Sequence, residues 1–183
     1  NNLTYIFSMK LRRASFVALL FLINTNLVAQ YSDIRAIWVV RDHIVKSESI
    51  DKILDFAKKN NYNHLFVQVR GRGDAYYKSN LVPRTHLLQN TNFDPLDYIL
   101  KKSKEFGNIK IHAWMNVYYL WSSFKKPIQD GHLLLKHPDW LDTNNPDLMD
   151  VHQILKKMEK NKKINGEGFY LAPTHPEVDA HLQ

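Results

Sequence analysis

Polar and aromatic side chains gather in the segment 64–79, where an apolar run gives way to a loop. The run has the length and composition of a buried strand, and it carries Gln68 and Arg70 at alternate positions. Beyond two glycines, the loop continues with Asp74 and Tyr77. These groups can hydrogen-bond a polar ligand or stack on it. Because α/β proteins place ligand sites where strands run out into loops, this segment is the first candidate for a binding site.

A second set of such side chains comes from the apolar segment 109–116. Side chains alternate along a strand, so His112, Trp114 and Asn116 share one face of it. We expect this strand to lie beside the first and to bring both sets to one face. They would then either fill the interior as a satisfied hydrogen-bond network or contact a polar ligand above the strand ends. The long connections that follow both strands favour the ligand.

Other chemistries find little support in the spacing of the residues. The candidate metal donors show no paired spacing, and the chain has no cysteine; the histidines concerned are His112, His132, His137 and His175. A serine-nucleophile elbow, a phosphate-binding Gly-Lys loop and a dinucleotide fingerprint are absent from the sequence. We therefore expect no metal and no cofactor. No two carboxylates can be assigned as acid and base from spacing, so the catalytic residues are unknown.

The elements that must position these residues alternate between strand and helix. The predicted order is strand 34–40, a helix from about 47 to 60, strand 65–70, a helix from 95 to 107, and strand 109–116. Ser47 or Ser49 is a candidate cap for the first helix. Asp94, followed by Pro95, begins the second, with Leu96, Ile99 and Leu100 on its apolar side and Gly107 at its end. Near-continuous apolar strands in this order predict an α/β fold with a parallel sheet.

The sequence after residue 116 is less regular. It predicts a turn at 137–141 that anchors Trp140, a helix at 146–160, a short apolar segment at 168–171 and a helix that begins near His175.

The first 29 residues have the composition of an export signal. Met9 is the first plausible start, and residues 1–8 are expected to lie upstream of it. Three basic residues precede an apolar run over 14–23, and a polar stretch leads to Ala29, after which we expect cleavage. The run is short for a membrane-spanning helix. The alternative is a buried N-terminal helix. The signal predicts a secreted or periplasmic protein with no membrane segment in its mature form.

Charge gives little reason to expect a nucleic-acid partner. The net charge of +7 falls to +4 when residues 1–29 are removed, because 22 basic and 18 acidic residues then remain. The basic pairs are scattered over predicted helices, as on a solvated helix face. The apolar share of 44% and the charged share of 23% are those of a globular domain.

Six short motifs in a fixed order resemble the N-terminal part of the bacterial glycosyl hydrolase-like 10 family. They are Arg35-x-x-Trp38, Val67-Gln68-Val69-Arg70 with Gly73-Asp74-Ala75-Tyr76-Tyr77-Lys78-Ser79, Phe93-Asp94-Pro95-Leu96, His112-Ala113-Trp114-x-Asn116, His137-Pro138-x-Trp140 and Tyr170-Leu171-x-Pro173. The resemblance implies a (β/α)8 TIM barrel that acts on polysaccharide in or near the cell envelope. Residues 30–183 would form the first three to four of its eight β/α units.

The resemblance also implies what this chain lacks. Ala172 stands where the family normally has Asp, and the strand expected to hold a catalytic carboxylate would follow Gln183. We therefore expect a truncated barrel, inactive alone, from a secreted glycoside hydrolase. The substrate would be a polysaccharide or oligosaccharide, bound by Gln68, Arg70, Asp74, Tyr77, His112, Trp114 and Asn116. The alternative is a non-catalytic carbohydrate-binding module. The glycan and the oligomeric state are left open.

Overall fold

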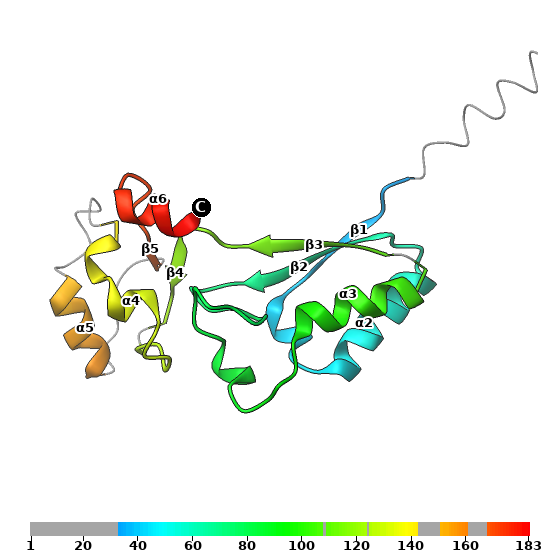
Figure 1. The fold of residues 1–183 in the computed structure, drawn as a ribbon, viewed down its shortest axis with the longest axis horizontal. Coiled ribbons are helices and arrows are strands. Elements are labelled where there is room, and N and C mark those ends of the chain that lie inside the picture. The colour runs from blue at the N-terminus through cyan, green and yellow to red at the C-terminus, as the bar shows by residue number, and fades with distance from the viewer. Residues whose placement is uncertain (1–32, 108, 124, 143–150, 161–167) are drawn as a thin grey trace, which may run out of the picture. The chain divides into compact units, whose positions relative to one another are not determined.

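The computed structural model describes residues 33–107, 109–123, 125–142, 151–160 and 168–183. The expected signal peptide lies outside the described residues. The chain divides into two units, Asn1–Ile34 and Arg35–Gln183, and all helices and strands named below belong to the second. In chain order they are β1 (Ala36–Val39), η1 (Arg41–Ile44), α2 (Ser47–Lys59), β2 (His64–Arg70), η2 (His86–Leu88), α3 (Pro95–Glu105), β3 (Lys110–Met115), β4 (Tyr119–Trp121), α4 (Leu133–Lys136), η3 (Pro138–Trp140), α5 (Val151–Glu159), β5 (Phe169–Tyr170) and α6 (Pro176–Leu182) (Figure 1). Within the described part of the chain, every helix is too short or too polar to cross a membrane.

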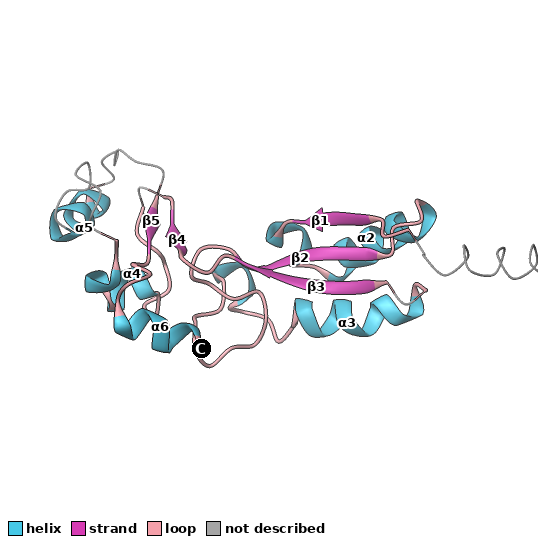
Figure 2. Ribbon diagram, turned by 90° about the horizontal axis from the view of Figure 1, so that it is seen from above, coloured by secondary structure: helices cyan, strands magenta, loops and turns pink. Residues whose placement is uncertain are grey.

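Three parallel strands in the order β1-β2-β3 form the main sheet (Figure 2). Helices α2 and α3 both lie on one side of it (Figure 1). Between the sheet and the helices lies a core of buried aliphatic side chains from both layers, Leu65, Val67 and Val69 among them. The predicted α/β arrangement with a parallel sheet is confirmed. The described residues form three parallel strands and not a closed barrel.

Helix α2 forms where its apolar spacing predicts. Ile50, Leu54 and Ala57 are fully buried against the sheet, and Ile53 packs beside them. The predicted serine cap is wrong, because the helix begins one residue earlier. The N-cap is Lys46, which makes no side-chain capping bond, and Ser47 is already helical.

Helix α3 begins as predicted and buries a slightly different side. The carboxylate of Asp94 accepts hydrogen bonds from the backbone N–H groups of residues 96 and 97, and Pro95 is the first helical residue. The buried side follows Leu96, Ile99 and Ser103, at a spacing of three and four residues. Leu100 lies off this line and is 44% exposed, which corrects its expected burial.

A register shift interrupts the pairing of β2 with β3. Phe66 pairs with His112 and Gln68 with Trp114, as simple alternation predicts. Beyond this point one extra residue is inserted in β2, so that Arg70 pairs with Met115. We expected simple alternation to bring both sets of polar side chains to one face of the sheet, and the register shift limits that alternation to the part of β2 up to Gln68.

The residues after β3 form a second hydrophobic cluster. Strands β4 and β5 pair antiparallel, and a single bridge joins Leu141 to Leu171 beside them. Trp140 is 7% exposed, so the predicted turn does anchor an aromatic side chain. The helix expected at 146–160 is described only from Val151 onward. The sequence did not predict β4, which is only three residues long.

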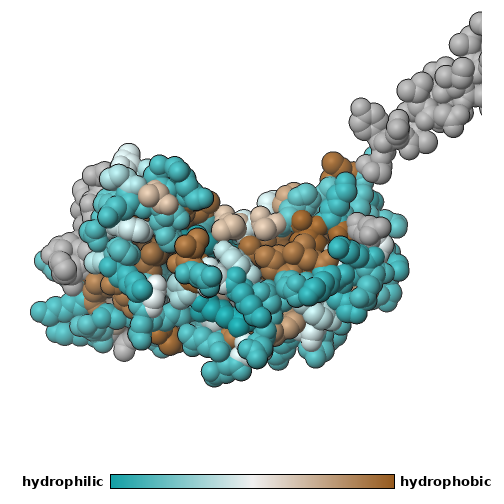
Figure 3. Space-filling view, in the orientation of Figure 1, coloured by the Kyte–Doolittle hydropathy of each residue, from teal (hydrophilic) through white to brown (hydrophobic). Residues whose placement is uncertain are grey.

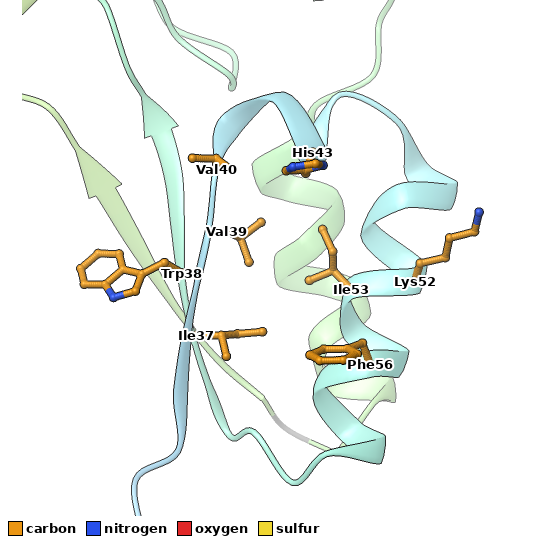
Figure 4. Close-up of a pocket in the computed structure, with 8 residues that line it drawn as sticks. All are labelled: Ile37, Trp38, Val39, Val40, His43, Lys52, Ile53 and Phe56. Carbon is orange, nitrogen blue, oxygen red and sulfur yellow. The ribbon is translucent and has the colours of Figure 1, made fainter.

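The sheet exposes apolar groups along β1. An apolar patch lies over the sheet (Figure 3), and Trp38 is 67% exposed. On the helix side a hollow of about 390 Å³ lies between β1 and α2, with Ile37 and Val39 pointing toward Ile53 and Phe56 while Trp38 points away (Figure 4). The hollow is mainly apolar, so it offers few groups that could orient a polar ligand.

Candidate functional site

Arg70 is the charged centre of the candidate site. It ends β2 and is only 6% exposed, and its Nε and Nη2 atoms have no hydrogen-bond partner among the described residues. Burial lowers the pKa of the guanidinium, while nearby Tyr77 and Asp74 raise it. A buried cation with unused donors is costly, and an incoming acceptor removes that cost. The geometry thus leaves Arg70 ready to bind an acceptor oxygen.

The loop after Arg70 is held in a tight conformation. Asp74 is 7% exposed, and its Oδ1 accepts a hydrogen bond from the backbone N–H of Arg72 at 3.2 Å. Between them Gly73 has φ +70°, a left-handed conformation that favours glycine. Its Cα approaches a neighbouring side chain so closely that an added Cβ would lie 2.6 Å from Leu120 Cδ1. The contact between Asp74 and the backbone of Arg72 therefore helps to hold the loop in this conformation.

His132 ties the same loop to the second hydrophobic cluster. The side chain is fully buried, and its Nδ1 accepts a hydrogen bond from the backbone N–H of Leu134 at 3.2 Å. The proton is therefore on Nε2, which donates to the carbonyl of Arg72 at 2.6 Å. Burial lowers the pKa of His132. Sequence spacing considered this residue only as a metal donor, because a contact over sixty residues has no local signal.

Gln68 is oriented by an arginine that the sequence did not single out. Arg41 Nη1 donates to Gln68 Oε1 at 3.0 Å, and Gln68 is 3% exposed. The arginine lies across Gly71, where an added Cβ would be 2.5 Å from its Cδ. Asp42, next in the chain, accepts a hydrogen bond from the hydroxyl of Tyr76 at 3.1 Å. Arg41 and Asp42 come just after β1, beyond Val40, at the same end of the sheet as Arg70. Their position at a strand exit is the sequence signal that could have identified them.

Asn116 fastens the ends of β2 and β3 together. Its backbone N–H donates to the carbonyl of Arg70 and its Nδ2 to the carbonyl of Gly71, both at 3.0 Å. Its Oδ1 accepts a hydrogen bond from Trp114 Nε1 at 3.0 Å. The amide thus holds the indole of Trp114 in place.

An aromatic row covers the face of the sheet opposite the helices. Trp38 stacks on Phe66 with ring centroids 4.7 Å apart, and Phe66 stacks on His112 at the same distance. Trp114 meets Trp38 edge-on at 5.1 Å. At the end of the row away from Trp38, His112 Nε2 lies 2.8 Å from His64 Nδ1, so the two imidazoles are hydrogen-bonded to each other. The row presents ring faces and edges that suit the apolar faces of a ligand.

The structure thus divides the expected site residues into two groups. Arg70, Asp74 and Tyr77 interact at the end of β2, and Asn116 links Trp114 to them through the backbone of β2. His112 belongs to the aromatic row, nearer the middle of the sheet, and Gln68 is engaged by Arg41. Asp74 is the one carboxylate among the expected site residues.

Polar and aromatic groups at the carboxyl end of a parallel sheet define an α/β protein with a candidate ligand site at its strand ends. The chain matches the family described as glycosyl hydrolase-like 10 over residues 33–183. It therefore belongs to that family, as its motifs predicted.

Two glycosyl hydrolases are similar to parts of the chain. Glycosyl hydrolase YngK of Bacillus subtilis (strain 168) is 29% identical over 97 residues, which are 49% of this chain and 19% of that protein. Glycosyl hydrolase DigH of Escherichia coli (strain K12) is 28% identical over 119 residues, which are 57% of this chain and 27% of that protein. The matched part of the chain thus covers less than a third of either relative.

Proposed function

We propose that the complete protein is a glycoside hydrolase that cleaves O-glycosidic bonds of a polysaccharide. Membership of the glycosyl hydrolase-like family supports this reaction class. The observation that carries the proposal is Arg70, a buried guanidinium with unpaired donors at the carboxyl end of a parallel sheet. Residues 30–183 would form the first β/α units of a (β/α)8 barrel, in which this end of the sheet holds the site.

In this proposal the site residues bind the sugar, and each has a distinct task. Arg70 donates hydrogen bonds to sugar oxygens through the Nε and Nη2 atoms that the chain leaves unpaired. Trp114 or Tyr77 stacks on a pyranose face. Asn116 keeps the indole in position, and Gln68, Asp74 and His112 line the surrounding wall.

Hydrolysis of a glycosidic bond needs two carboxyl groups, one to protonate the leaving oxygen and one to act as base or nucleophile. Asp74 is engaged by the backbone of its own loop, which suits a positioning role better than proton transfer. We therefore leave both catalytic roles unassigned. We also propose that residues 9–29 direct export, which the mass and N-terminus of the mature protein would test.

The test compares substitutions at the site with matched substitutions elsewhere in the complete protein. Arg70→Ala and Asn116→Ala should each lower kcat/KM for polysaccharide, and Arg70→Ala by about 10- to 100-fold, since a hydrogen bond to a charged group contributes about 1.5–3 kcal/mol. Arg35→Ala and Asn80→Ala are the controls, because both residues are exposed and Arg35 lies at the opposite end of the sheet. Unchanged kinetics in the Arg70 variant, with a wild-type circular dichroism spectrum, would refute the site.

A non-catalytic carbohydrate-binding module is the second candidate. The aromatic row of Trp38, Phe66 and His112 favours it, because stacked rings alone are enough to hold sugars. Glycan binding by the complete protein without any release of reducing ends would favour the module. Release of reducing ends that depends on Arg70 would favour the hydrolase.

A further inference from the structure

A second group of ligand-type side chains lies outside the candidate site, where η3 meets the start of α6. Asp139, His175 and Glu177 each bring one donor atom to a common point, and these three atoms lie within 4.8 Å of one another. The donors are an imidazole nitrogen and two carboxylate oxygens. Sequence spacing does not predict this group, because its members come from two separate segments.

The backbone fixes these two segments against each other. The N–H of Ala172 donates to the carbonyl of Trp140 at 2.8 Å, and the N–H of Asp142 donates to the carbonyl of Tyr170 at 2.9 Å. Both segments also carry the same local pattern, with a histidine before the helix, proline at its first position and an acid next. This pattern puts Asp139 in the first turn of η3 and Glu177 in the first turn of α6, and the backbone contacts between the two segments bring these first turns together.

The contacts around the group resemble the support that metal ligands receive. Trp140 Nε1 donates to Glu177 Oε2 at 2.9 Å, which orients that carboxylate. The Nδ1 atom of His175 is buried without a hydrogen-bond partner among the described residues. His175 does not cap its helix through its side chain, and its ring lies against that of Trp140 with the ring centroids 6.1 Å apart.

Among the residues that the structure describes, the carboxylates of the group are not paired with a basic side chain. Within the described residues, no lysine or arginine forms an ion pair with Asp139 or Glu177. Two carboxylates that face one point repel each other, and a cation at that point removes the repulsion. Because one donor is an imidazole nitrogen, the set suits Zn²⁺ and similar transition metals better than Mg²⁺ or Ca²⁺, which prefer oxygen.

We propose that Asp139, His175 and Glu177 bind one Zn²⁺ ion, which ties η3 to the start of α6. Three protein donors leave a fourth position for water in a tetrahedral site. The metal would join two segments of the second hydrophobic cluster, and it would use no residue of the candidate sugar site.

The experiment measures metal binding by the chelator-treated full chain. Co²⁺ serves as the probe, because its visible absorption reports ligation, and Zn²⁺ is then added as competitor. One Co²⁺ per chain is expected, displaced by Zn²⁺ and not by Mg²⁺. His175→Gln, Asp139→Asn and Glu177→Gln should each weaken binding by at least about 10-fold. Zn²⁺ should also raise the Tm of the wild-type chain and not that of the variants.

Two matched controls separate this site from adventitious binding. His86→Gln and Asp130→Asn change an exposed histidine and an exposed aspartate elsewhere, and both should bind Co²⁺ like the wild type. Glu177→Gln keeps an acceptor for Trp140 Nε1, so it decides the question if another variant loses its wild-type circular dichroism spectrum. The absence of saturable one-to-one binding, or equal binding by the wild type and all three ligand variants, would overturn the proposal.

Discussion

Replacing Gly73 by alanine should destabilise the fold through the loop that carries Asp74. At φ +70° an alanine loses about 1–2 kcal/mol relative to glycine, because its Cβ crowds the backbone. The added Cβ would also lie 2.6 Å from Leu120 Cδ1 and 3.0 Å from His132 Nε2. Both side chains are buried and cannot move freely. Overpacking of this kind costs about 1–3 kcal/mol, so we expect a total loss of about 2–5 kcal/mol.

Two other glycines of the chain separate the contributions. Gly107 has φ +102°, and no atom of the described residues beyond its chain neighbours lies within 4 Å of an added Cβ, so Gly107→Ala reports the backbone strain alone. Gly131 has ordinary φ and its nearest neighbour is Pro83 Cβ at 3.8 Å, so Gly131→Ala should change stability by less than about 0.5 kcal/mol.

The assay is urea denaturation of the full chain, with circular dichroism as the signal that monitors unfolding. Gly73→Ala should lose about 1–3 kcal/mol more free energy of unfolding than Gly107→Ala, which is the overpacking cost. If Gly73→Ala were as stable as Gly131→Ala, the close approach of the loop to Leu120 and His132 would be wrong. The wild type and the Gly131→Ala variant should unfold at nearly the same urea concentration.

Three further predictions concern capping and titration. Asp94→Ala removes a carboxylate that accepts three hydrogen bonds from backbone N–H groups, and it should lower the free energy of unfolding in urea by about 1–2 kcal/mol. Its control is Asp97→Ala, which removes an exposed ion pair and should lower that free energy by less than about 0.5 kcal/mol. Burial raises the pKa of Tyr76 to about 12, whereas an unfolded tyrosine titrates near pH 10. The neutral side chain therefore contributes its whole stabilisation below about pH 10, and this contribution is lost as the pH rises through about 12. Tyr76→Phe should remove this loss of stability at alkaline pH. Burial lowers the pKa of His132. The neutral imidazole therefore contributes its whole stabilisation above pH about 6.5, the ordinary pKa of histidine, and this contribution is lost as the pH falls below that value. In a plot of Tm against pH, His132→Asn should make the decrease on the acid side shallower.

The sequence alone determined the order and type of the main elements. Alternating strand and helix patterns predicted β1, α2, β2, α3 and β3 because each depends on residues close together in the chain. Capping by Asp94 was predictable for the same reason. The ordered motifs predicted the family, and the strand exits predicted which end of the sheet would collect Arg70 and Asp74.

Only the tertiary structure decided how these side chains are held. The register shift that sets Arg70 opposite Met115 depends on the pairing of two strands, which no single segment encodes. The contacts of Arg41 with Gln68 and of His132 with Arg72 join residues far apart in sequence. Side-chain periodicity predicts burial within one element. Partners across elements follow only from packing, and packing fixes the geometry of both proposed sites.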